Sequence, residues 1–561
     1  MNDGSIGSTF NEGLMTVEGE TAYCIDINTD FKNGYKTRAD ASTRMSAAQI
    51  SDVALSLEYI KQYAASHPEL NYKQVYLLEQ CMVWRTLSIY LGWSCDNVRA
   101  AYDEIPQAVQ DGVYANAKAF AVENRDRYDC GGYIYSGEGQ ELGQFWAKLA
   151  VGNANIQKVS SDPSVSADND CYSLAGATYG LFSDQDCTAQ VATLTTDRDG
   201  NTETVEVRAG TLYIKELSAP TGFKLDSTVY TLTVKAGETA TLKVSDTPKA
   251  TSTEIELFKI DMETGKAVAQ GAASLEGAEF VWNYYDGYYT KENLPSEPTR
   301  TWTTKTVAET DRDGTTHYVT GLDNAYKVSG DDFYVMDGKN VLPLGTLTVQ
   351  ESKSPTGYLL EGAYLQAEGS EEQIKGLYVT QITEDGDLAV LSGSNQFSVS
   401  DQVIRGGVKI QKRDLETGDT KAQGGATLKD TSFEIVSLND NPVLVEGKLY
   451  QKNEVVKTIH TGIDGIAATS SDLLPYGDYQ IRESKAPAGY LTEGAKPVEF
   501  SITEDGQIVD LTGEETSIYN QVKRGDIEGM KMAAGTHKRL ANVPFKITDE
   551  YEKELKMKVR Q

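Results

Sequence analysis

The stretch IRESKAPAGYL, from Ile481 to Leu491, decides the fold because close copies of it occur twice earlier in the chain. The copies are VQESKSPTGYL from Val349 and IKELSAPTGF from Ile214. In each copy a Glu precedes a Pro by four residues and an aromatic residue by seven; these are Glu216, Glu351 and Glu483. A phrase with fixed internal spacing but irregular outer spacing indicates tandem homologous domains with loops of different length.

The bulk composition supports several β-rich domains. A chain of 561 residues is too long for one hydrophobic core, and 39% hydrophobic with 24% charged residues is typical of globular domains. The 32 Tyr and 50 Gly favour strands joined by tight turns. The formal net charge of −31, without any basic cluster, argues against a nucleic-acid partner.

Neither end of the chain carries a targeting signal. The start, MNDGSIGSTF, has no basic region and no apolar core, and the end, YEKELKMKVRQ, has no membrane or wall anchor. No apolar run is long enough to cross a bilayer. Either the protein stays inside the cell, or this is a piece of a longer secreted chain; the repeats favour the second interpretation.

Each repeat opens with an alternating strand that contains a Lys and closes with a strand that contains Asp or Asn. The opening strands are NIQKVSSD, TEIELFKIDMETG and GVKIQKRDLETG, with Lys158, Lys259 and Lys412. The closing strands are LKVSDTPK, FSVSDQVIRGG and SIYNQVKRGD, with Asp246, Asp401 and Asn520. Alternation places every second side chain on one face, but it does not say which face is buried.

Short strands with turn punctuation predict β-sandwiches. The Asp-Gly of ITEDG, at residues 382–386 and 502–506, predicts type I′ hairpins. We expect an N-terminal domain at 1–153 and sandwich repeats at 154–249, 250–405 and 406–524. Residues 525–561, with Lys531 in the opening-Lys position, read as a truncated fourth repeat that lacks most of its sheet.

The N-terminal region has a different pattern. Residues 45–65, 71–92 and 111–124 show helical periodicity, with Val75, Leu78, Met82 and Leu87 among the apolar positions. The segment TAYCIDIN, with Cys24, is extended. We therefore expect a mixed α/β domain here.

The six cysteines leave several pairings open. Cys171 and Cys187 are expected on consecutive strands of the first repeat, where they predict a disulfide in an exported protein; the alternative is a pair of free thiols. Four further cysteines lie in the N-terminal region: Cys24, Cys81, Cys95 and Cys130.

From residue 154 onward the chain resembles the B-type domains of Gram-positive collagen-binding adhesins and the SpaA-like pilins. The resemblance rests on the opening Lys, the E-x-x-x-P-x-G-[YF] phrase and the closing Asp or Asn. It implies immunoglobulin-like sandwiches locked by spontaneous isopeptide bonds, with each Glu as the proton shuttle. The implied sets are Lys158, Glu216 and Asp246; Lys259, Glu351 and Asp401; and Lys412, Glu483 and Asn520.

The chemistry of such a bond is coherent. Burial favours a neutral, nucleophilic amine and a protonated carboxyl, and a rigid core supplies proximity. By analogy with loops closed by disulfides, each bond would add ~4–5 kcal/mol of stability. The alternative is that these Lys and Glu side chains are exposed and the shared phrase is only a Pro-Gly turn.

The first quarter of the chain resembles the thioester domain of Gram-positive surface adhesins. The residues that carry this are YCI around Cys24 and a later helix with EQCMVW, although Glu79 and Met82 stand where that family has Thr and a small residue. The resemblance implies a bond from Cys24 to the side chain of Gln80, with Trp84 one turn on. The alternative is a disulfide from Cys24 to Cys81, Cys95 or Cys130; with a thioester, Cys95 and Cys130 could pair and Cys81 would be free.

The sequence predicts no metal site and no cofactor, because its four His are scattered and no ligand spacing or phosphate loop appears. Together the resemblances imply an extracellular, wall-anchored, monomeric adhesin that captures a Lys amine on a host protein, and not a turnover enzyme. It would reach the bacterial wall through a C-terminal region outside this chain. The rival interpretations are a structural pilin subunit, and an adhesin that binds protein or glycan without a covalent bond.

Overall fold

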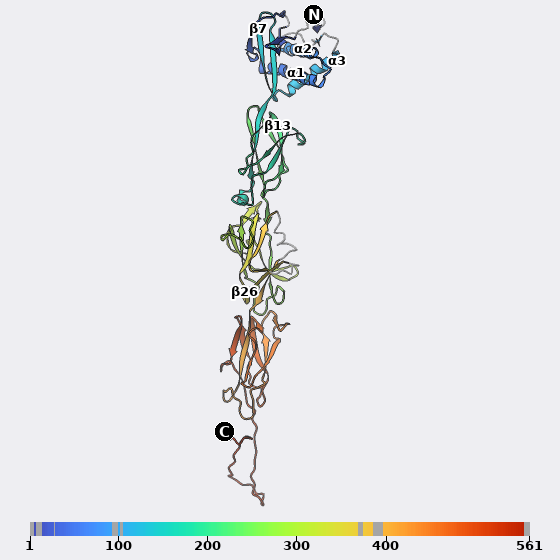
Figure 1. The fold of residues 1–561 in the computed structure, drawn as a ribbon. Coiled ribbons are helices and arrows are strands. Elements are labelled where there is room, and N and C mark those ends of the chain that lie inside the picture. Colours follow the sequence, from blue (N-terminus) through green and yellow to red (C-terminus); the bar gives the residue numbers. More distant parts are fainter. Residues whose placement is uncertain are drawn as a thin grey trace. The chain divides into compact units, whose positions relative to one another are not determined.

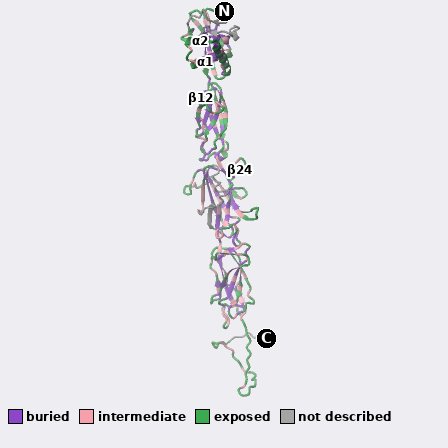
Figure 2. Cartoon of the chain, turned by 90° about the vertical axis from the view of Figure 1, so that its right-hand side faces the viewer, coloured by how far each residue is buried: buried purple, intermediate pink, exposed green. Residues whose placement is uncertain are grey.

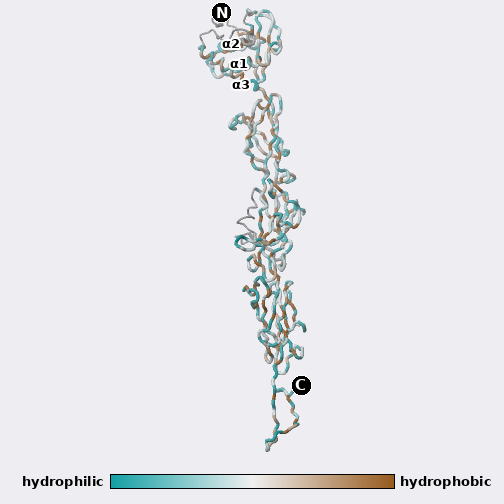
Figure 3. The backbone as a smooth tube through the Cα atoms, turned by 180° about the vertical axis from the view of Figure 1, so that it is seen from behind, coloured by the Kyte–Doolittle hydropathy of each residue, from teal (hydrophilic) through white to brown (hydrophobic). Residues whose placement is uncertain are grey.

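The computed structural model describes residues 5–6, 14–26, 29–91, 99–100, 105–367, 374–384 and 397–554. The chain forms two compact units, Met1–Ser161 with Tyr172–Pro248 and Asp162–Cys171 with Lys249–Gln561. Among the described helices, none combines the length and apolar character needed to span a bilayer. Figure 3 colours the backbone by hydropathy and shows hydrophilic and hydrophobic residues interspersed along the chain.

The first unit opens with a mixed α/β domain, as predicted. Its helices are α1 (Ala47–Ser66), α2 (Tyr72–Leu91), α3 (Gln107–Glu123) and the 3-10 turn η1 (Ala41–Thr43). They pack beside a sheet of order β4-β8-β7-β5, formed by Tyr23–Cys24, Leu142–Leu149, Tyr128–Gly137 and Lys36–Asp40 (Figure 1). Short pairs complete the domain: β1 (Ser5–Ile6) with β6 (Arg99–Ala100), and β2 (Thr16–Val17) with β3 (Glu20–Thr21).

Local sequence explains where α1 begins and which face it buries. The Ser46 side chain accepts from the Gln49 amide, and Gln49 Oε1 accepts from the Ser46 amide, which forms a capping box. The apolar face of α1 joins Leu78 and Met82 of α2 in one core. The three helices expected from periodicity are therefore present.

The rest of the first unit is a two-sheet sandwich, here called the first sandwich. One sheet has the order β11-β10-β13-β14 and the other β12-β9-β15. The strands are β9 (Val151–Ser160), β10 (Thr178–Phe182), β11 (Gln190–Thr195), β12 (Val205–Arg208), β13 (Gly210–Ser218), β14 (Val229–Val234) and β15 (Thr239–Asp246).

The second sandwich lies in the second unit. Its main sheets have the orders β20-β21-β17-β29-β26-β27 and β22-β19-β18-β25-β28, with a small sheet β16-β24-β23. The strands are β16 (Ala250–Ser252), β17 (Leu257–Asp261), β18 (Glu279–Tyr285), β19 (Arg300–Lys305), β20 (Val307–Thr310), β21 (Thr316–Thr320), β22 (Lys327–Gly330), β23 (Tyr334–Met336), β24 (Lys339–Pro343), β25 (Gly345–Lys353), β26 (Tyr358–Ala367), β27 (Ile374–Lys375), β28 (Tyr378–Ile382) and β29 (Phe397–Val403).

The third sandwich follows in the same unit. β30 pairs with β35, β36, β39 and β40, and the facing sheet has the order β34-β31-β37-β38; β32 and β33 form a hairpin. The strands are β30 (Arg405–Asp414), β31 (Ser432–Ser437), β32 (Val443–Val445), β33 (Lys448–Tyr450), β34 (Val455–His460), β35 (Ile466–Ala468), β36 (Leu474–Pro475), β37 (Gly477–Lys485), β38 (Val498–Ile502), β39 (Gln507–Leu511) and β40 (Ile518–Asn520).

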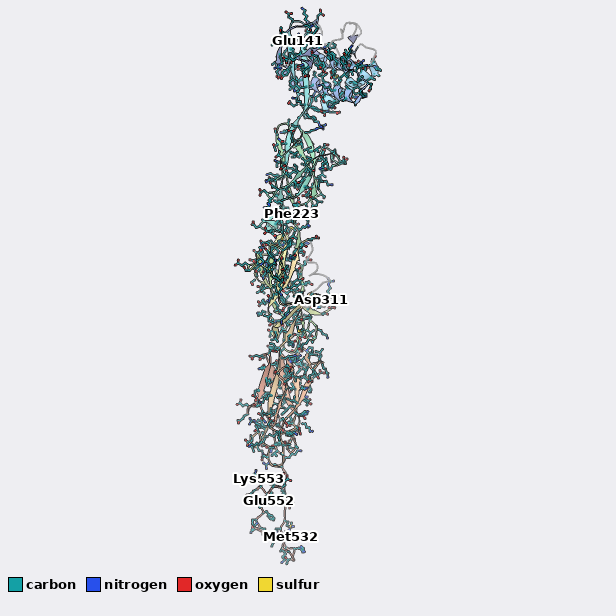
Figure 4. All side chains as sticks on the ribbon, viewed as in Figure 1. Glu141, Phe223, Asp311, Met532, Glu552 and Lys553 are labelled. Carbon is teal, nitrogen blue, oxygen red and sulfur yellow. The ribbon has the colours of Figure 1, made fainter. Side chains whose placement is uncertain are left out.

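Residues 525–554 form only isolated bridges, Met532 with Arg539 and Thr548 with Glu554. Most of these residues are exposed (Figure 2), and the side chains of Met532, Glu552 and Lys553 are marked in Figure 4. This is the stretch in which the sequence predicts a fourth repeat without its sheet.

Two expectations from the sequence are wrong. The ITEDG of residues 502–506 does not make a hairpin, because β38 pairs with β37 in one sheet whereas β39 pairs in parallel with β30 in the other. Its Asp-Gly turn therefore connects the two sheets. The earlier ITEDG extends into residues outside the described part of the chain.

The expected Cys171–Cys187 disulfide is also not formed. Cys171 lies in a turn after the short helix α4 (Pro163–Ser166) and Cys187 in a bend between β10 and β11, so neither is on a strand, and both are free thiols. Cys81 and Cys130 are free as well. Cys95 lies outside the described residues.

The second and third sandwiches meet in a close joint. Gly271 accepts a side-chain hydrogen bond from Asn441 and donates its amide to Pro442 O at 3.2 Å. Its φ is +61°, and a Cβ there would lie 2.1 Å from the carbonyl oxygen of Tyr476, so only glycine fits. Tyr476 packs against the apolar cluster around Tyr358.

Arg405, the first residue of β30, fastens this joint. Its guanidinium forms an ion pair with Glu263 of the second sandwich, with Nε 2.7 Å from Oε1. It also donates to the carbonyl oxygens of Leu473 at 2.8 Å and Leu444 at 2.9 Å in the third sandwich. One side chain therefore satisfies groups from both sandwiches.

We expect Arg405→Ala to weaken this joint by roughly 2–3 kcal/mol, because it leaves a partly buried carboxylate and two carbonyls without their charged donor. Hydrogen exchange at the amides of Gly271 and Leu444 measures the free energy of local opening. Arg524→Ala is the matched control: Arg524 pairs with Glu416 in the third sandwich, but its side chain is 47% exposed, so the change should be within about 1 kcal/mol. Unchanged protection in Arg405→Ala would contradict the role of this side chain.

Candidate functional site

The opening and closing strands of each sandwich lie side by side and parallel. Each Lys pairs with the residue two positions before the closing Asp or Asn: Lys158 with Val244, Lys259 with Val399, and Lys412 with Ile518. Because side chains alternate along a strand, the Lys and the Asp or Asn then share a face. That face is the buried one, and all three Lys are 0% exposed.

In each sandwich the Glu comes from a strand of the opposite sheet. Glu216, Glu351 and Glu483 lie on β13, β25 and β37. Each pairs across the sheet with an aromatic residue beside a register shift: Tyr179, Phe280 and Phe433 respectively. The same irregularity therefore aims all three carboxyls into the core, opposite the Lys strand.

The third sandwich shows the clearest arrangement. Lys412 Nζ lies 3.0 Å from Oε2 of Glu483, and Asn520 Nδ2 donates to Oε1 of the same carboxyl at 3.0 Å. The amine also donates to Ile518 O at 2.9 Å. Burial lowers the pKa of Lys412 to about 8, which favours the neutral amine. One carboxyl thus contacts both the amine of Lys412 and the side-chain amide of Asn520.

The second sandwich holds one amine against two carboxyls. Lys259 Nζ lies 2.6 Å from Glu351 Oε2 and 2.5 Å from Asp401 Oδ1. Burial raises the pKa of Glu351 to about 8 and also raises the pKa of Asp401. Two buried carboxyls beside one ammonium cannot both ionise without an uncompensated charge, so one of them keeps a proton.

The first sandwich brings its predicted residues together in the same way. Lys158 Nζ lies 2.7 Å from Glu216 Oε1 and forms an ion pair with Asp246. Burial raises the pKa of Asp246 to about 6. Lys158 also donates to the hydroxyl of Tyr179 at 2.7 Å, a contact that the sequence pattern did not predict.

The aromatic residue of the repeated phrase has a structural role. Tyr358 and Tyr490 donate to Asp261 at 2.9 Å and Asp414 at 2.7 Å, the residues that pair with Asp401 and Asn520. The first sandwich instead has Phe223 (marked in Figure 4), and Ser160 occupies the matching position on β9. The Tyr–Asp contact thus anchors the phrase beside the Lys strand in two sandwiches only.

The N-terminal domain places Cys24 against Gln80. The Cys24 amide donates to Gln80 Oε1 at 2.7 Å, and Gln80 Nε2 donates to Cys24 O at 3.0 Å. The neighbouring pair is also bonded, because Tyr23 donates its hydroxyl to Glu79 Oε2 at 2.9 Å. β4 is therefore fastened to α2 through two consecutive residues.

The thiol of Cys24 is shielded from solvent. The residue is 0% exposed, its Sγ donates to Asp26 O at 3.1 Å, and burial raises its pKa to about 12. The Gln80 carbonyl receives the Cys24 amide, a contact of the kind that stabilises a developing oxyanion. The structure contains Cys24 as a free thiol.

A known domain family matches two of the three sandwiches. Residues 165–248 and 407–517 match the family model of the SpaA prealbumin-like fold domain, so these two segments are SpaA-type domains. No curated protein matches the chain.

Solved structures give weaker likenesses. The Bacillus anthracis TIE protein is 17% identical over 90% of this chain and 94% of its own, with a TM-score of 0.40. BcpA, the major pilin subunit of Bacillus cereus, is 18% identical over 66% of this chain and 100% of its own, with a TM-score of 0.25. A C-terminal fragment of the pilus adhesin SpaC from Lactobacillus rhamnosus GG is 17% identical over 45% of this chain and 96% of its own, with a TM-score of 0.23. Such low values establish neither function nor chemistry.

We predict that the free Cys24 thiol resists alkylation at neutral pH. In Gln80→Met, which has no acyl group to offer, iodoacetamide should label Cys24 at least ~100-fold more slowly than an ordinary exposed thiol, because burial suppresses the thiolate. Peptide mass mapping measures this, with Cys187, which lies partly exposed in a bend, as the internal control. Rapid labelling of Cys24 near pH 7 would show that the thiol is accessible and that burial does not suppress its thiolate.

Proposed function

We propose that this chain is the outer part of a Gram-positive surface adhesin. In it, Lys–Asp and Lys–Asn isopeptide bonds lock the sandwiches of a stalk, and a Cys24–Gln80 thioester captures an amine. The SpaA-type segments support the surface-protein class. The observation that carries the stalk chemistry is Glu483, whose two oxygens contact Lys412 and Asn520 separately.

In the third sandwich the reaction would expel ammonia. The Lys412 ammonium gives a proton to Glu483, and its neutral nitrogen attacks Cγ of Asn520. Glu483 returns the proton to the amide nitrogen, the Cγ–Nδ2 bond breaks, and the second proton given up by the amine accompanies the departing ammonia, which leaves as ammonium. A single Lys–Asn amide remains, and the carboxylate is regenerated.

In the first and second sandwiches the reaction would expel water. The electrophile is a buried Asp carboxyl, whose raised pKa favours the protonated form that can lose its hydroxyl group. The neutral Lys nitrogen bonds to Cγ and gives up one proton, and the hydroxyl group of the protonated Asp leaves with that proton as water. Each sandwich reacts once, so the chain is self-processing and not a turnover enzyme.

The placement of the bonds suits a stalk under tension. Each would join the opening strand of a sandwich directly to its closing strand. Pulling on the two ends of the sandwich would then load a covalent link instead of the hydrogen bonds of the sheets. A major consequence would be resistance to mechanical unfolding.

The proposed capture step is a thioester exchange. The Cys24 sulfur bonds to Cδ of Gln80, the Cδ–Nε2 bond breaks, and the thiol proton leaves with the nitrogen as ammonia. An amine on another molecule, such as a Lys of a host surface protein, then displaces the sulfur. It becomes an amide of Gln80, and the thiol of Cys24 is restored.

A second candidate is a stalk or pilin subunit whose N-terminal domain binds without a covalent bond. Glu79 and Met82, which depart from the thioester pattern, favour this candidate. The SpaA-type segments are compatible with either function. The two candidates differ in whether the protein reacts with a small amine.

Intact mass under non-reducing conditions tests both parts. The proposal predicts two ammonia losses, at Cys24–Gln80 and Lys412–Asn520, and two water losses, at Lys158–Asp246 and Lys259–Asp401. Methylamine should then add once to the protein, and should not add to Cys24→Ala. An unreactive protein that still shows the losses in its sandwiches would support the stalk subunit over the covalent adhesin.

Replacing Glu351 by Gln tests the proton shuttle. We expect that the Lys259–Asp401 bond does not form and that no water is expelled, because an amide cannot exchange protons with Lys259. Without the bond, the second sandwich should be ~4–5 kcal/mol less stable. Peptide mass mapping detects the missing cross-link. Glu279→Gln is the matched control on the paired strand, since Glu279 binds Lys353 outside the core. Normal cross-linking in Glu351→Gln would exclude Glu351 as the shuttle.

A further inference from the structure

The first sandwich differs from the other two at a position next to the reacting amine. Tyr179 pairs with Glu216 across the sheet, at the register where Phe280 pairs with Glu351 and Phe433 with Glu483. The three aromatic residues lie beside the same register shift, so the first sandwich has one extra hydroxyl group. The repeated phrase itself gives no hint of this difference.

The Tyr179 hydroxyl contacts the amine of its site. It accepts a hydrogen bond from Lys158 Nζ at 2.7 Å, and the same Nζ donates to Glu216 Oε1 at 2.7 Å. The side chain is 1% exposed, and burial raises its pKa, so the hydroxyl stays protonated and can donate. Phe280, by contrast, has no hydroxyl group. The Nζ of Lys259 lies over its ring, 5.9 Å from the ring centroid.

A second feature concerns the hydrogen bonds that Glu216 accepts. Its Oε2 accepts a hydrogen bond from the backbone amide of Asp226 at 2.8 Å. The Tyr230 hydroxyl in turn donates to Oδ2 of Asp226 at 2.6 Å. Both oxygens of Glu216 are thus hydrogen-bonded. Oε1 of Glu351, the equivalent carboxyl in the second sandwich, is buried and receives no backbone amide.

Hydrogen bonds to ionised groups favour the ionised forms, whereas the bond-forming reaction needs a neutral amine. We propose that Tyr179 slows isopeptide formation in the first sandwich by stabilising the Lys158–Glu216 ion pair against the neutral pair. The inference rests on the proposed function. The hydroxyl is not consumed: Lys158 still passes a proton to Glu216, attacks Cγ of Asp246 and expels one water.

Tyr179→Phe tests this directly, because it recreates the aromatic residue of the other two sandwiches. The full chain would be synthesised as a pulse in a cell-free reaction and sampled over time. Cross-linked peptides from each sandwich would be quantified by mass spectrometry. The second sandwich, which has the same Lys–Asp chemistry, is the internal clock. We expect the half-time of the first sandwich to fall about tenfold relative to that clock.

Phe280→Tyr is the reciprocal variant and should lengthen the half-time of the second sandwich. Far-ultraviolet circular dichroism verifies that both variants are folded. An equal or longer half-time for the first sandwich in Tyr179→Phe would overturn the proposal while leaving the isopeptide chemistry intact. No cross-link in the first sandwich of either protein, with a normal one in the second, would overturn it too. If the parent chain loses no water in either the first or the second sandwich, the proposed function itself would be contradicted.

Discussion

A lysine amine enclosed in an apolar core is the constraint on which each sandwich depends. An unpaired ammonium there would cost several kcal/mol, so the core must provide a carboxylate, neutralise the amine or bond it covalently. All three lysines are fully buried, and each has a Glu on the opposite sheet. An isopeptide bond resolves the constraint permanently, since it replaces a buried charge by an amide.

The same local geometry is used with different chemistry. An offset of two residues between the parallel opening and closing strands places the Lys beside the Asp or Asn. A bulge in the opposite sheet directs the Glu side chain toward them. Within that frame, Asn520 offers a neutral target with one carboxyl, whereas Asp401 brings a second carboxyl that must share a proton. The N-terminal domain uses a related principle, in which the backbone of Cys24 holds the Gln80 carboxamide by two hydrogen bonds.

Much of this arrangement could be predicted from the sequence, because the fixed spacing around Glu351 and its copies identified the residues that the structure brings together. Alternation could not say which face of β17 is buried, since Lys259 is charged and Phe258 is apolar, yet Lys259 faces the core. The parallel pairing of β39, the joint at Arg405 and the hydroxyl of Tyr179 depend on contacts between distant residues. No local pattern encodes them.

The central claim is that the buried lysine nitrogens are acylated. Selective labelling of the lysine side chains with nitrogen-15 at Nζ tests it most directly, through proton–nitrogen correlation spectra of the folded chain. The account predicts three one-proton amide signals from Lys158, Lys259 and Lys412 that are protected from exchange with solvent. Spectra in which all lysine nitrogens remain ammonium or amine would contradict it.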